Sequence, residues 1–437
     1  MKAKYRSPGK ILVLGVVFMI NRILVSFLVL LVLNGCSTIR GYFRMDLMSP
    51  YIRSEIVTSP EREQEILAKA KLGWTSDGRI RVLYVKGSPY ERGYQHGALL
   101  REEVQKNLGY FYKRAVSKFH GTQIFEEAFE RMRPHIPEEY MQEMQGLAHG
   151  AKLPLALIHH IHVLPEIGEW SGKNKIREVL RKMMAGEFAT TCSNLASQAG
   201  ASADGEMYVM RILDWGLHRI SRLHEFPLIA INIPEHGVPS ANIGWVGFLG
   251  AVSGMNGAGI TLGEMGYGGP DNETLHGFPM PFLLRHVMTN AKSLQDVRQI
   301  ISTATPTNSF VYLMSDGKTA EAELYVRDPA RFIVFKPGED IQEGEKGAKG
   351  IPGLVYGGAR DEVMQTELMA NHGTITPEVL MKDLIPKFAL KSNFQNVIYL
   401  PRKLQFWVAN AESASEYAAS QPYTFFDLGE GLATFNQ

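Results

Sequence analysis

Hydrophobic and polar positions change their spacing about halfway along the chain. Before residue 192 the spacing favours helices, at about residues 61–71, 89–118 and 138–149, then from residue 154 and over 173–184. Ser88, Pro89 and Glu91 form a capping box with proline at the first helical position, and Gly150 is expected to end the helix over 138–149.

Short apolar segments, often rich in β-branched residues, dominate after residue 192. They are separated by glycine, proline and aspartate turns and predict strands at 207–213, 228–233, 241–252, 260–262, 310–314, 320–326 and 331–335. Helices are predicted again at 281–290, 294–303, 360–371 and 377–384. Strands that alternate with helix pairs imply stacked layers of sheet and helix, so the fold class is α+β.

Chain length and composition indicate how large the core can be, and the net charge argues against nucleic acid as a partner. With 437 residues, 45% of them apolar, the chain can bury a large core in one big domain or two intermediate ones. A formal net charge of +1 gives no sign of nucleic-acid binding. No internal repeat, heptad series or low-complexity tract is visible.

The N-terminus is typical of an exported protein. Residues 23–33 are apolar apart from one serine, follow Arg22 and lead to Cys36, which is the pattern of a bacterial lipoprotein signal. We therefore predict a signal peptide over 1–35, with Met19 as the working start, and lipidation of Cys36.

An uncleaved signal anchor is the alternative, because residues 11–20 extend the apolar run. Both interpretations place the remaining chain outside the cytoplasm. The lipoprotein interpretation predicts a bacterial cell-envelope protein, periplasmic or surface-exposed, that a lipid anchor attaches to the membrane. Residues 36–80 are then a tether.

Cys192 is the other of only two cysteines and lies where the helical half meets the strand half. Asp204 and Gly205 favour a hairpin turn, so the strand that begins at Cys192 should pair with the strand that leads to Asp214. This pairing brings Cys192 beside Arg211 and Asp214. A guanidinium near a thiol favours the nucleophilic thiolate.

No histidine is obviously placed to act as the base for this thiol. A chain break between Thr191 and Cys192 would create an α-amino group with a pKa of about 7.7–8.0, which can accept the thiol's proton. In a regular strand Arg211 and Asp214 point to opposite faces. A bulge or a strand end near Leu213 is therefore expected.

Four motifs together resemble the C45 family, which contains the acyl-coenzyme A:6-aminopenicillanate acyltransferases. The group is similar to bile-salt hydrolases and acid ceramidases, all N-terminal-nucleophile (Ntn) hydrolases. The motifs are 87–97 (GSPYERGYQHG), 143–150 (EMQGLAHG), Cys192 followed by 211–215 (RILDW), and 254–260 (GMNGAGI).

The resemblance implies a four-layer αββα Ntn-hydrolase sandwich that is made as a precursor and cuts itself before the nucleophile. It divides the chain into a helical pro-segment or α chain, 81–191, and a catalytic domain, 192–437. Cys192 would be nucleophile and base, and Arg211 with Asp214 would match the group's Arg-x-x-Asp pair.

The resemblance also implies donors for an oxyanion hole. These are a backbone N–H near Glu264 or Met265 and the side chain of Asn308, with Asn256 as a further site residue. Asn308 lies a few positions earlier than the group's pattern, and Glu264 stands where a small or amide residue is more usual. Neither a cofactor nor a metal is expected.

Each of these residues has a structural alternative. Cys192 can be an ordinary buried thiol, Arg211 with Asp214 a structural ion pair, and Asn256 a turn residue. The histidines at 159, 160 and 162 do not share one helix face and lack an obvious acidic ligand, which argues against a metal site.

Three functions follow as hypotheses. The first is an amidohydrolase that cleaves the C–N bond of a small-molecule or lipid N-acyl amide. The second is an acyltransferase that passes the same acyl group to an amine. The third is an anchored surface protein that keeps the fold without turnover.

Overall fold

Two large sheets dominate the structure, a computed structural model that describes residues 59–170, 192–198, 200–216, 221–266, 273–343, 346–358 and 360–435. The larger sheet has nine strands, which in sheet order are β1 (Lys71–Trp74), β2 (Arg81–Gly87), β5 (Pro227–Pro234), β6 (Ser240–Trp245), β7 (Ser253–Asn256), β8 (Ile260–Gly266), β9 (Phe310–Asp316), β10 (Glu321–Arg327) and β11 (Phe332–Phe335). Neighbouring strands are antiparallel except β2 and β5, which are parallel.

The smaller sheet has six antiparallel strands. In sheet order these are β14 (Leu354–Gly357), β3 (Ser193–Ser197), β4 (Tyr208–Leu213), β15 (Gln395–Leu400), β16 (Gln405–Asn410) and β17 (Thr424–Asp427). A separate hairpin is formed by β12 (Ile341–Glu343) and β13 (Lys346–Ala348).

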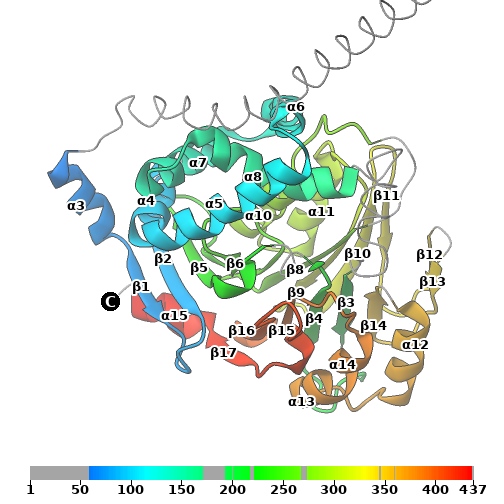
Figure 1. The fold of residues 1–437 in the computed structure, drawn as a ribbon. Coiled ribbons are helices and arrows are strands. Elements are labelled where there is room, and N and C mark those ends of the chain that lie inside the picture. Colours follow the sequence, from blue (N-terminus) through cyan, green and yellow to red (C-terminus); the bar gives the residue numbers. More distant parts are fainter. Residues whose placement is uncertain are drawn as a thin grey trace, which may run out of the picture.

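Helices cover the outer face of each sheet (Figure 1). Over the nine-stranded sheet lie α4 (Pro89–Leu99), α5 (Arg101–Lys118), α6 (Gln123–Met132), α7 (Glu138–Ala151), α8 (Leu155–Trp170), α10 (Met280–Asn290) and α11 (Leu294–Thr303). Under the six-stranded sheet lie α12 (Asp361–Ala370), α13 (Pro377–Val379) and α14 (Ile385–Phe388). Two further helices, α3 (Pro60–Ala68) and α15 (Leu428–Phe435), lie near β1 and β2.

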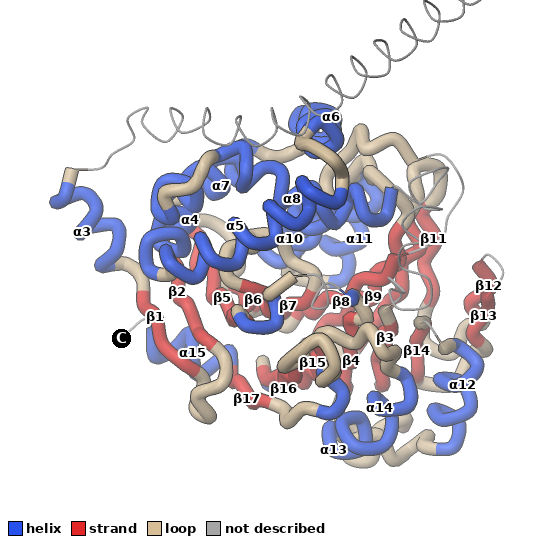
Figure 2. The backbone as a smooth tube through the Cα atoms, in the orientation of Figure 1, coloured by secondary structure: helices blue, strands red, loops and turns tan. Residues whose placement is uncertain are grey.

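Alternation along the strands explains this stacking. In β5, Leu228 packs with the helices of the N-terminal half, whereas Ile229 packs in the core between the sheets. In β4, Val209 faces the same inter-sheet core and Met210 faces α12 and α14. Both faces of each sheet are therefore buried, and the layers run helix, sheet, sheet, helix (Figure 2).

Four close-packed glycines join α4 to α7. A Cβ added at Gly93 would lie 1.9 Å from the carbonyl oxygen of Glu143, and one at Gly150 would lie 2.3 Å from that of Tyr94. Gly150 was expected to end α7. Instead α7 continues through Gly150 to Ala151, and the capping residue Lys152 adopts a left-handed conformation with φ of 54°.

Two predicted elements are interrupted. The helix predicted over 89–118 breaks at Leu100, whose φ of −118° and ψ of 31° separate α4 from α5, so each helix follows its own packing partners. The strand predicted over 241–252 ends at Trp245, and the chain turns through Gly247, with φ of 87°, before β7 begins.

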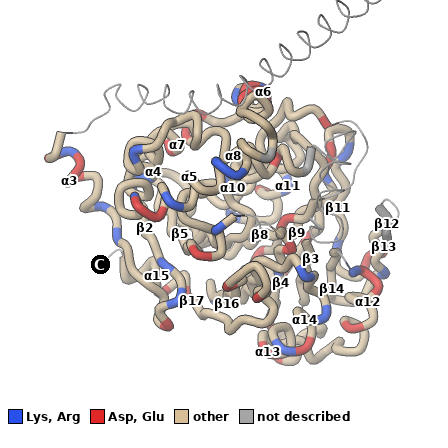
Figure 3. Tube along the Cα trace, in the orientation of Figure 1, with Lys and Arg blue, Asp and Glu red and all other residues tan. Residues whose placement is uncertain are grey.

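Part of the predicted tether is ordered. Residues 60–68 form α3, and β1 then adds an edge strand beside β2. Basic and acidic residues are interspersed along the described trace (Figure 3). None of the helices in the described ranges combines the length and the apolar character that a membrane span requires. Cys36, Thr191 and the helix predicted over 173–184 lie outside those ranges.

Candidate functional site

Cys192 lies at the start of β3 and is 6% exposed. The predicted hairpin is present, because β3 pairs with β4 and Asn194 is directly opposite Arg211. Residues two apart in a strand share a face, so Cys192 and Arg211 lie diagonally on the face that looks toward the larger sheet.

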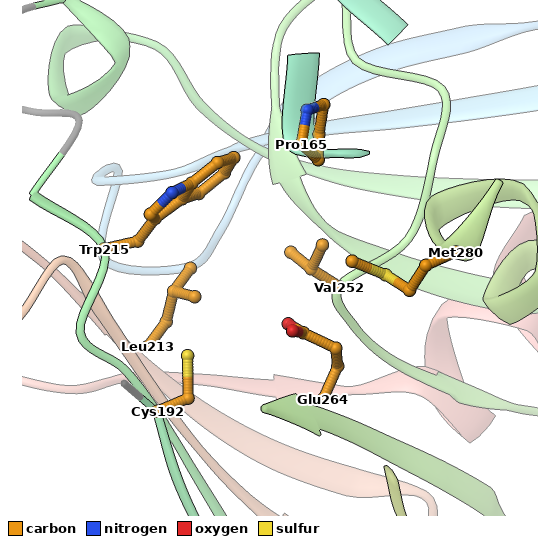
Figure 4. A pocket seen from close by; sticks show the side chains of 7 residues that line it. All are labelled: Pro165, Cys192, Leu213, Trp215, Val252, Glu264 and Met280. Atoms are coloured by element: carbon orange, nitrogen blue, oxygen red, sulfur yellow. The ribbon is translucent and has the colours of Figure 1, made fainter. Parts of the chain in front are cut away.

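A pocket opens above the Cys192 thiol (Figure 4). It holds about 360 Å³ of unfilled space, including its open mouth. In Figure 4 the side chains of Cys192 and Glu264 both point into it. The lining residues come from both sides of the sequence boundary at 192 and are Pro165, Cys192, Leu213, Trp215, Val252, Glu264 and Met280.

Arg211 is fully buried, and its guanidinium makes polar contacts with described residues on several sides. One Nη lies 3.2 Å from a carboxylate oxygen of Glu264, and the other donates to the carbonyl oxygen of Ile212 at 2.7 Å. Its Nε donates to the carbonyl oxygen of Val252 at 3.4 Å. Burial opposes its charge, but the neighbouring Cys192 and Glu264 raise the pKa of Arg211 above its ordinary value.

Burial raises the pKa of the Cys192 thiol to about 12, although Arg211 lowers it. Glu264 and Asp214 add to the rise because each disfavours a second negative charge nearby. Arg211 alone therefore does not produce a thiolate in the uncut chain. The thiol is protonated at neutral pH and needs a base.

Asp214 lies just past the end of β4, so its side chain does not have to follow the alternation of faces along the strand. A strand end, and not a bulge, therefore lets Arg211 and Asp214 escape the opposite faces of a regular strand. One carboxylate oxygen accepts from the backbone N–H of Leu390 at 3.2 Å. The other, Oδ1, is buried and has no hydrogen-bond partner among the described residues. Burial raises the pKa of Asp214 to about 7.

Glu264 contributes a side chain that the sequence interpretation missed, since only backbone donors were expected near it. It lies on β8, is 5% exposed and pairs with Arg211. Burial raises its pKa, while Arg211 lowers it. The available signal was a carboxylate within the otherwise small and apolar strand 260–266.

Asn256 ends β7 and is fully committed to a turn. Its Nδ2 donates to the carbonyl oxygens of Met288 at 3.0 Å and Ala291 at 2.8 Å. Its Oδ1 accepts from the backbone N–H groups of Ala258 and Ile260, both at 3.0 Å. The side chain does not line the Cys192 pocket. This arrangement favours the turn interpretation of Asn256.

Asn308 is fully buried just before β9 and also does not line the pocket directly. Its Nδ2 donates to the Glu166 side chain at 2.7 Å and to the Glu166 carbonyl oxygen at 3.1 Å. Glu166 follows Pro165, which does line the pocket. The structure therefore links Asn308 to the site through α8.

A second, apolar cavity adjoins the first and shares Pro165 and Trp215 with it. It holds about 370 Å³ of unfilled space, again including open solvent. All of its lining residues are apolar or aromatic: Leu108, Phe111, Ile161, Leu164, Pro165, Trp215, Leu223, Trp245 and Phe248. Such a lining suits an apolar group more than a charged one.

The three neighbouring histidines of α8 have separate structural roles. His159 stacks on Phe129 with ring centroids 4.0 Å apart, and the ring of His160 lies 2.8 Å from the Tyr112 hydroxyl. His162 accepts from the backbone N–H of Leu249 at 2.9 Å. Over the described ranges, no three His, Cys, Asp or Glu side chains gather as a metal site.

Comparison with known proteins gives distant likenesses. No family model matches the chain. It is 22% identical to the dcd1B protein of Dictyostelium discoideum over 273 residues, which is 56% of this chain and 50% of that protein. An uncharacterized protein of Archaeoglobus fulgidus is also 22% identical, over 55% of this chain and 42% of that protein. The chain thus spans about half the length of these curated relatives.

Solved structures give similarly distant matches. An N-acylethanolamine-hydrolyzing acid amidase ortholog of Caenorhabditis elegans has a TM-score of 0.38 and 12% identity, over 54% of this chain and 100% of that one. A mutant of the conjugated bile acid hydrolase of Clostridium perfringens has a TM-score of 0.34 and 10% identity, over 55% and 93%. Penicillin V acylase of Agrobacterium tumefaciens has a TM-score of 0.25 and 10% identity, over 55% and 79%. These likenesses are too distant to assign an activity.

Proposed function

We propose that this chain is a self-processing cysteine amidase of the Ntn type, which cleaves N-acyl amides through an acyl-enzyme on Cys192. One observation carries the proposal. The Cys192 thiol points into a pocket beside the buried ionisable groups Arg211, Glu264 and Asp214. The motifs that resemble the C45 family support the same assignment.

The proposed base is made by the protein itself. In the uncut chain the pKa of the thiol is about 12, and none of the described residues that line the pocket is a histidine. Cleavage of the bond between Thr191 and Cys192 gives Cys192 an α-amino group with a pKa of about 7.7–8.0. Oδ1 of Asp214, for which the described residues offer no hydrogen-bond partner, is the proposed acceptor for the ammonium form of this group.

The reaction then proceeds in two steps. The α-amino group takes the thiol proton, and the sulfur attacks the amide carbonyl carbon to form a tetrahedral oxyanion. The C–N bond breaks as the ammonium returns a proton to the leaving amine, which leaves a thioester on Cys192. The α-amino group of Cys192 then deprotonates a water molecule, which attacks the thioester. The carboxylic acid and the free thiol are released.

The apolar cavity beside the pocket supports an apolar acyl group as the substrate portion bound there. Each buried methylene is worth about 0.8 kcal/mol, or about fourfold in kcat/KM. A series of N-acyl-4-nitroanilides of increasing chain length should therefore show rising kcat/KM until the cavity is full. Leu164→Trp, which narrows this cavity, should shift the optimum to shorter chains.

Intact-mass analysis tests self-processing. The wild-type protein should give two fragments that meet at the Thr191–Cys192 bond, and Cys192→Ala should remain whole. Cys36→Ala is the matched control because it removes the other cysteine, and it should be cut like wild type. A wild-type chain that stays whole would contradict the proposed base.

Turnover of N-octanoyl-4-nitroaniline tests the chemistry. The cut wild-type protein should release 4-nitroaniline, whereas Cys192→Ala should not. Full turnover by Cys192→Ala would overturn the proposal, and a cut protein that releases nothing from any N-acyl amide would favour a binding role. Added hydroxylamine tests for the acyl-enzyme, because it converts a thioester on Cys192 to the hydroxamate and frees the thiol.

We further propose that the protein is anchored to the bacterial envelope through lipid on Cys36. The apolar segment before that cysteine supports this proposal. Cys36→Ala should move the protein from the membrane fraction to the soluble fraction. Continued membrane association of this variant would favour the signal-anchor interpretation instead.

A further inference from the structure

The loop that joins β6 to β7, residues 246–252, borders both cavities. Phe248 lines the apolar cavity, and Val252 lines the reactive pocket that holds Cys192 (Figure 4). Every residue of this loop is buried except Phe248, which is partly exposed. Irregular segments generally run over the surface, because a buried one needs a partner for each backbone N–H and C=O group. The partners of this loop therefore show what holds it in place.

Two buried histidines from helices before residue 192 bind the backbone of this loop. Nε2 of His96, in α4, accepts from the N–H of Gly247 at 2.9 Å. Nε2 of His162, in α8, accepts from the N–H of Leu249 at 2.9 Å. Burial lowers the pKa of His96 to about 3 and that of His162 to about 4, so both rings are neutral at neutral pH. Nδ1 of His162 lies 2.7 Å from the carbonyl oxygen of Ile158, which places the ring proton on Nδ1 and leaves Nε2 as the acceptor.

Contacts with α5 restrict the same loop. Nδ2 of Asn107 donates to the carbonyl oxygen of Val246 at 2.7 Å. Gly247 has a φ of 87°, and a Cβ added there would lie 2.8 Å from the side chain of Leu108, which lines the apolar cavity. The shape of the loop is therefore set by groups that lie outside it.

His162 connects the backbone of the loop to the wall of the apolar cavity. Its ring stacks on the ring of Phe248, with centroids 5.4 Å apart and an interplanar angle of 4°. Phe248 also lies between the two residues whose N–H groups the histidines bind. The Phe248 ring is thus held both through its backbone and through its face.

We propose that His162 is a positioning residue, which holds Phe248 in the wall of the apolar cavity and so sets the length of acyl chain that the site prefers. The inference rests on the proposed function, because it takes this cavity as the site of the acyl group. His96 and Asn107 hold the same loop. The helices before residue 192 then select the substrate, although the nucleophile belongs to the segment that follows.

Equilibrium dialysis of N-acyl-4-nitroanilides against the full chain tests this role. All proteins carry Cys192→Ala, so that the probes are bound but not cleaved. N-octanoyl-4-nitroaniline has four methylenes more than the N-butanoyl probe and should bind about 250-fold more tightly, at about fourfold in Kd for each buried methylene.

His162→Phe keeps an aromatic ring but removes the acceptor for the Leu249 N–H. The ratio of the two Kd values should fall by about tenfold or more, which corresponds to about two methylenes left unburied. The Kd of the N-butanoyl probe should change less than about twofold, because a short chain buries little surface in the cavity. A general loss of structure would instead weaken both probes alike.

Three further variants isolate the contact. His160→Phe is the matched control, because His160 is a buried neutral histidine of the same helix that contacts the Tyr112 hydroxyl, and it should keep the ratio of the parent. His162→Gln supplies a side-chain oxygen as acceptor and should restore most of the ratio. Phe248→Ala removes the positioned ring, so His162→Phe/Phe248→Ala should have the same ratio as Phe248→Ala alone.

Several results would overturn the inference. These are a ratio near one in the parent, an unchanged ratio in His162→Phe, equal weakening of both probes, and additive losses in the double variant. Where His162→Phe does not fold, Asn107→Leu is measured by the same criteria, because it removes the donor to Val246 in the same loop, and an unchanged ratio there also overturns the inference. Failure of the proposed function appears separately, as a wild-type protein that neither cuts itself nor releases 4-nitroaniline.

Discussion

The buried pair of Arg211 and Glu264 gives a strong test of how the site is held together. Arg211 is 0% exposed, and its guanidinium lies 3.2 Å from the Glu264 carboxylate. Arg211→Met removes the charge but keeps most of the side-chain length. It leaves the carboxylate buried without its cation, and it also removes the donors to the carbonyl oxygens of Ile212 and Val252.

The expected loss is large. Removing one partner of a buried ion pair typically costs about 3–5 kcal/mol, because the remaining charge is uncompensated. Replacing both partners by apolar residues is often close to neutral. We therefore expect Arg211→Met to lower the free energy of unfolding by about 4 kcal/mol, and Arg211→Met/Glu264→Leu to recover most of that loss.

The loss should depend on pH in one direction. Burial raises the pKa of Glu264, and without Arg211 it rises further above its ordinary value of 4.5. As the pH rises above about 4.5 the unfolded chain releases this proton before the folded chain does. The deficit of Arg211→Met is therefore smallest in acid and grows toward neutral pH.

Guanidinium chloride denaturation followed by tryptophan fluorescence, at pH 5 and pH 8, measures these effects. All variants carry Cys192→Ala, so that each protein is one uncut chain. Arg222→Met is the control, because the Arg222–Glu225 pair is exposed and should matter little. An Arg211→Met variant as stable as its parent, or a double variant no more stable than Arg211→Met, would refute the reasoning.

Three further predictions concern the helices and turns that surround the site. Gly93→Ala should destabilise the protein by more than about 2 kcal/mol in thermal unfolding, because the new methyl group would meet an α7 carbonyl oxygen at 1.9 Å. Gly109→Ala in α5 is the control and should not destabilise the protein, because an added Cβ there has nothing within 4 Å. Asn256→Ala should cost about 3 kcal/mol by denaturation, since four hydrogen bonds are lost, three of them buried. A cost below about 1 kcal/mol would contradict the turn role. Burial lowers the pKa of His162 to about 4 from 6.5, so the stability it contributes is complete above about pH 6.5 and is lost as the pH falls toward 4, by about 3 kcal/mol in total. His162→Gln should flatten the stability profile between those values, and an unchanged profile would count against the neutral acceptor role toward Leu249.

Local patterns predicted much of the fold. The pairing of β3 with β4 was predicted from the turn signal at Asp204 and Gly205, and the structure pairs these strands, with Asn194 opposite Arg211. The capping box of Ser88, Pro89 and Glu91 predicted the start of a helix, and α4 begins at Pro89 with that capping box formed. These features depend on residues close together in the sequence, which is why the sequence shows them.

The missed features depend on residues far apart. Glu264 meets Arg211 across 53 positions, and Glu166 meets Asn308 across 142. No spacing rule connects such pairs before the sheets are stacked. The break at Leu100 has the same origin, because helix propensity alone does not indicate where packing against α7 ends and the cover over the sheet begins.

The parallel pairing of β2 with β5 has a consequence for a nicked molecule. β2 precedes residue 192 and β5 follows it, and they are hydrogen-bonded neighbours inside one sheet. A cut before Cys192 would therefore leave two polypeptides that share one sheet and form a single cooperative unit. Separating them would leave β5 paired only with β6 and expose its other edge, which would favour aggregation. The two fragments should therefore unfold together in one transition.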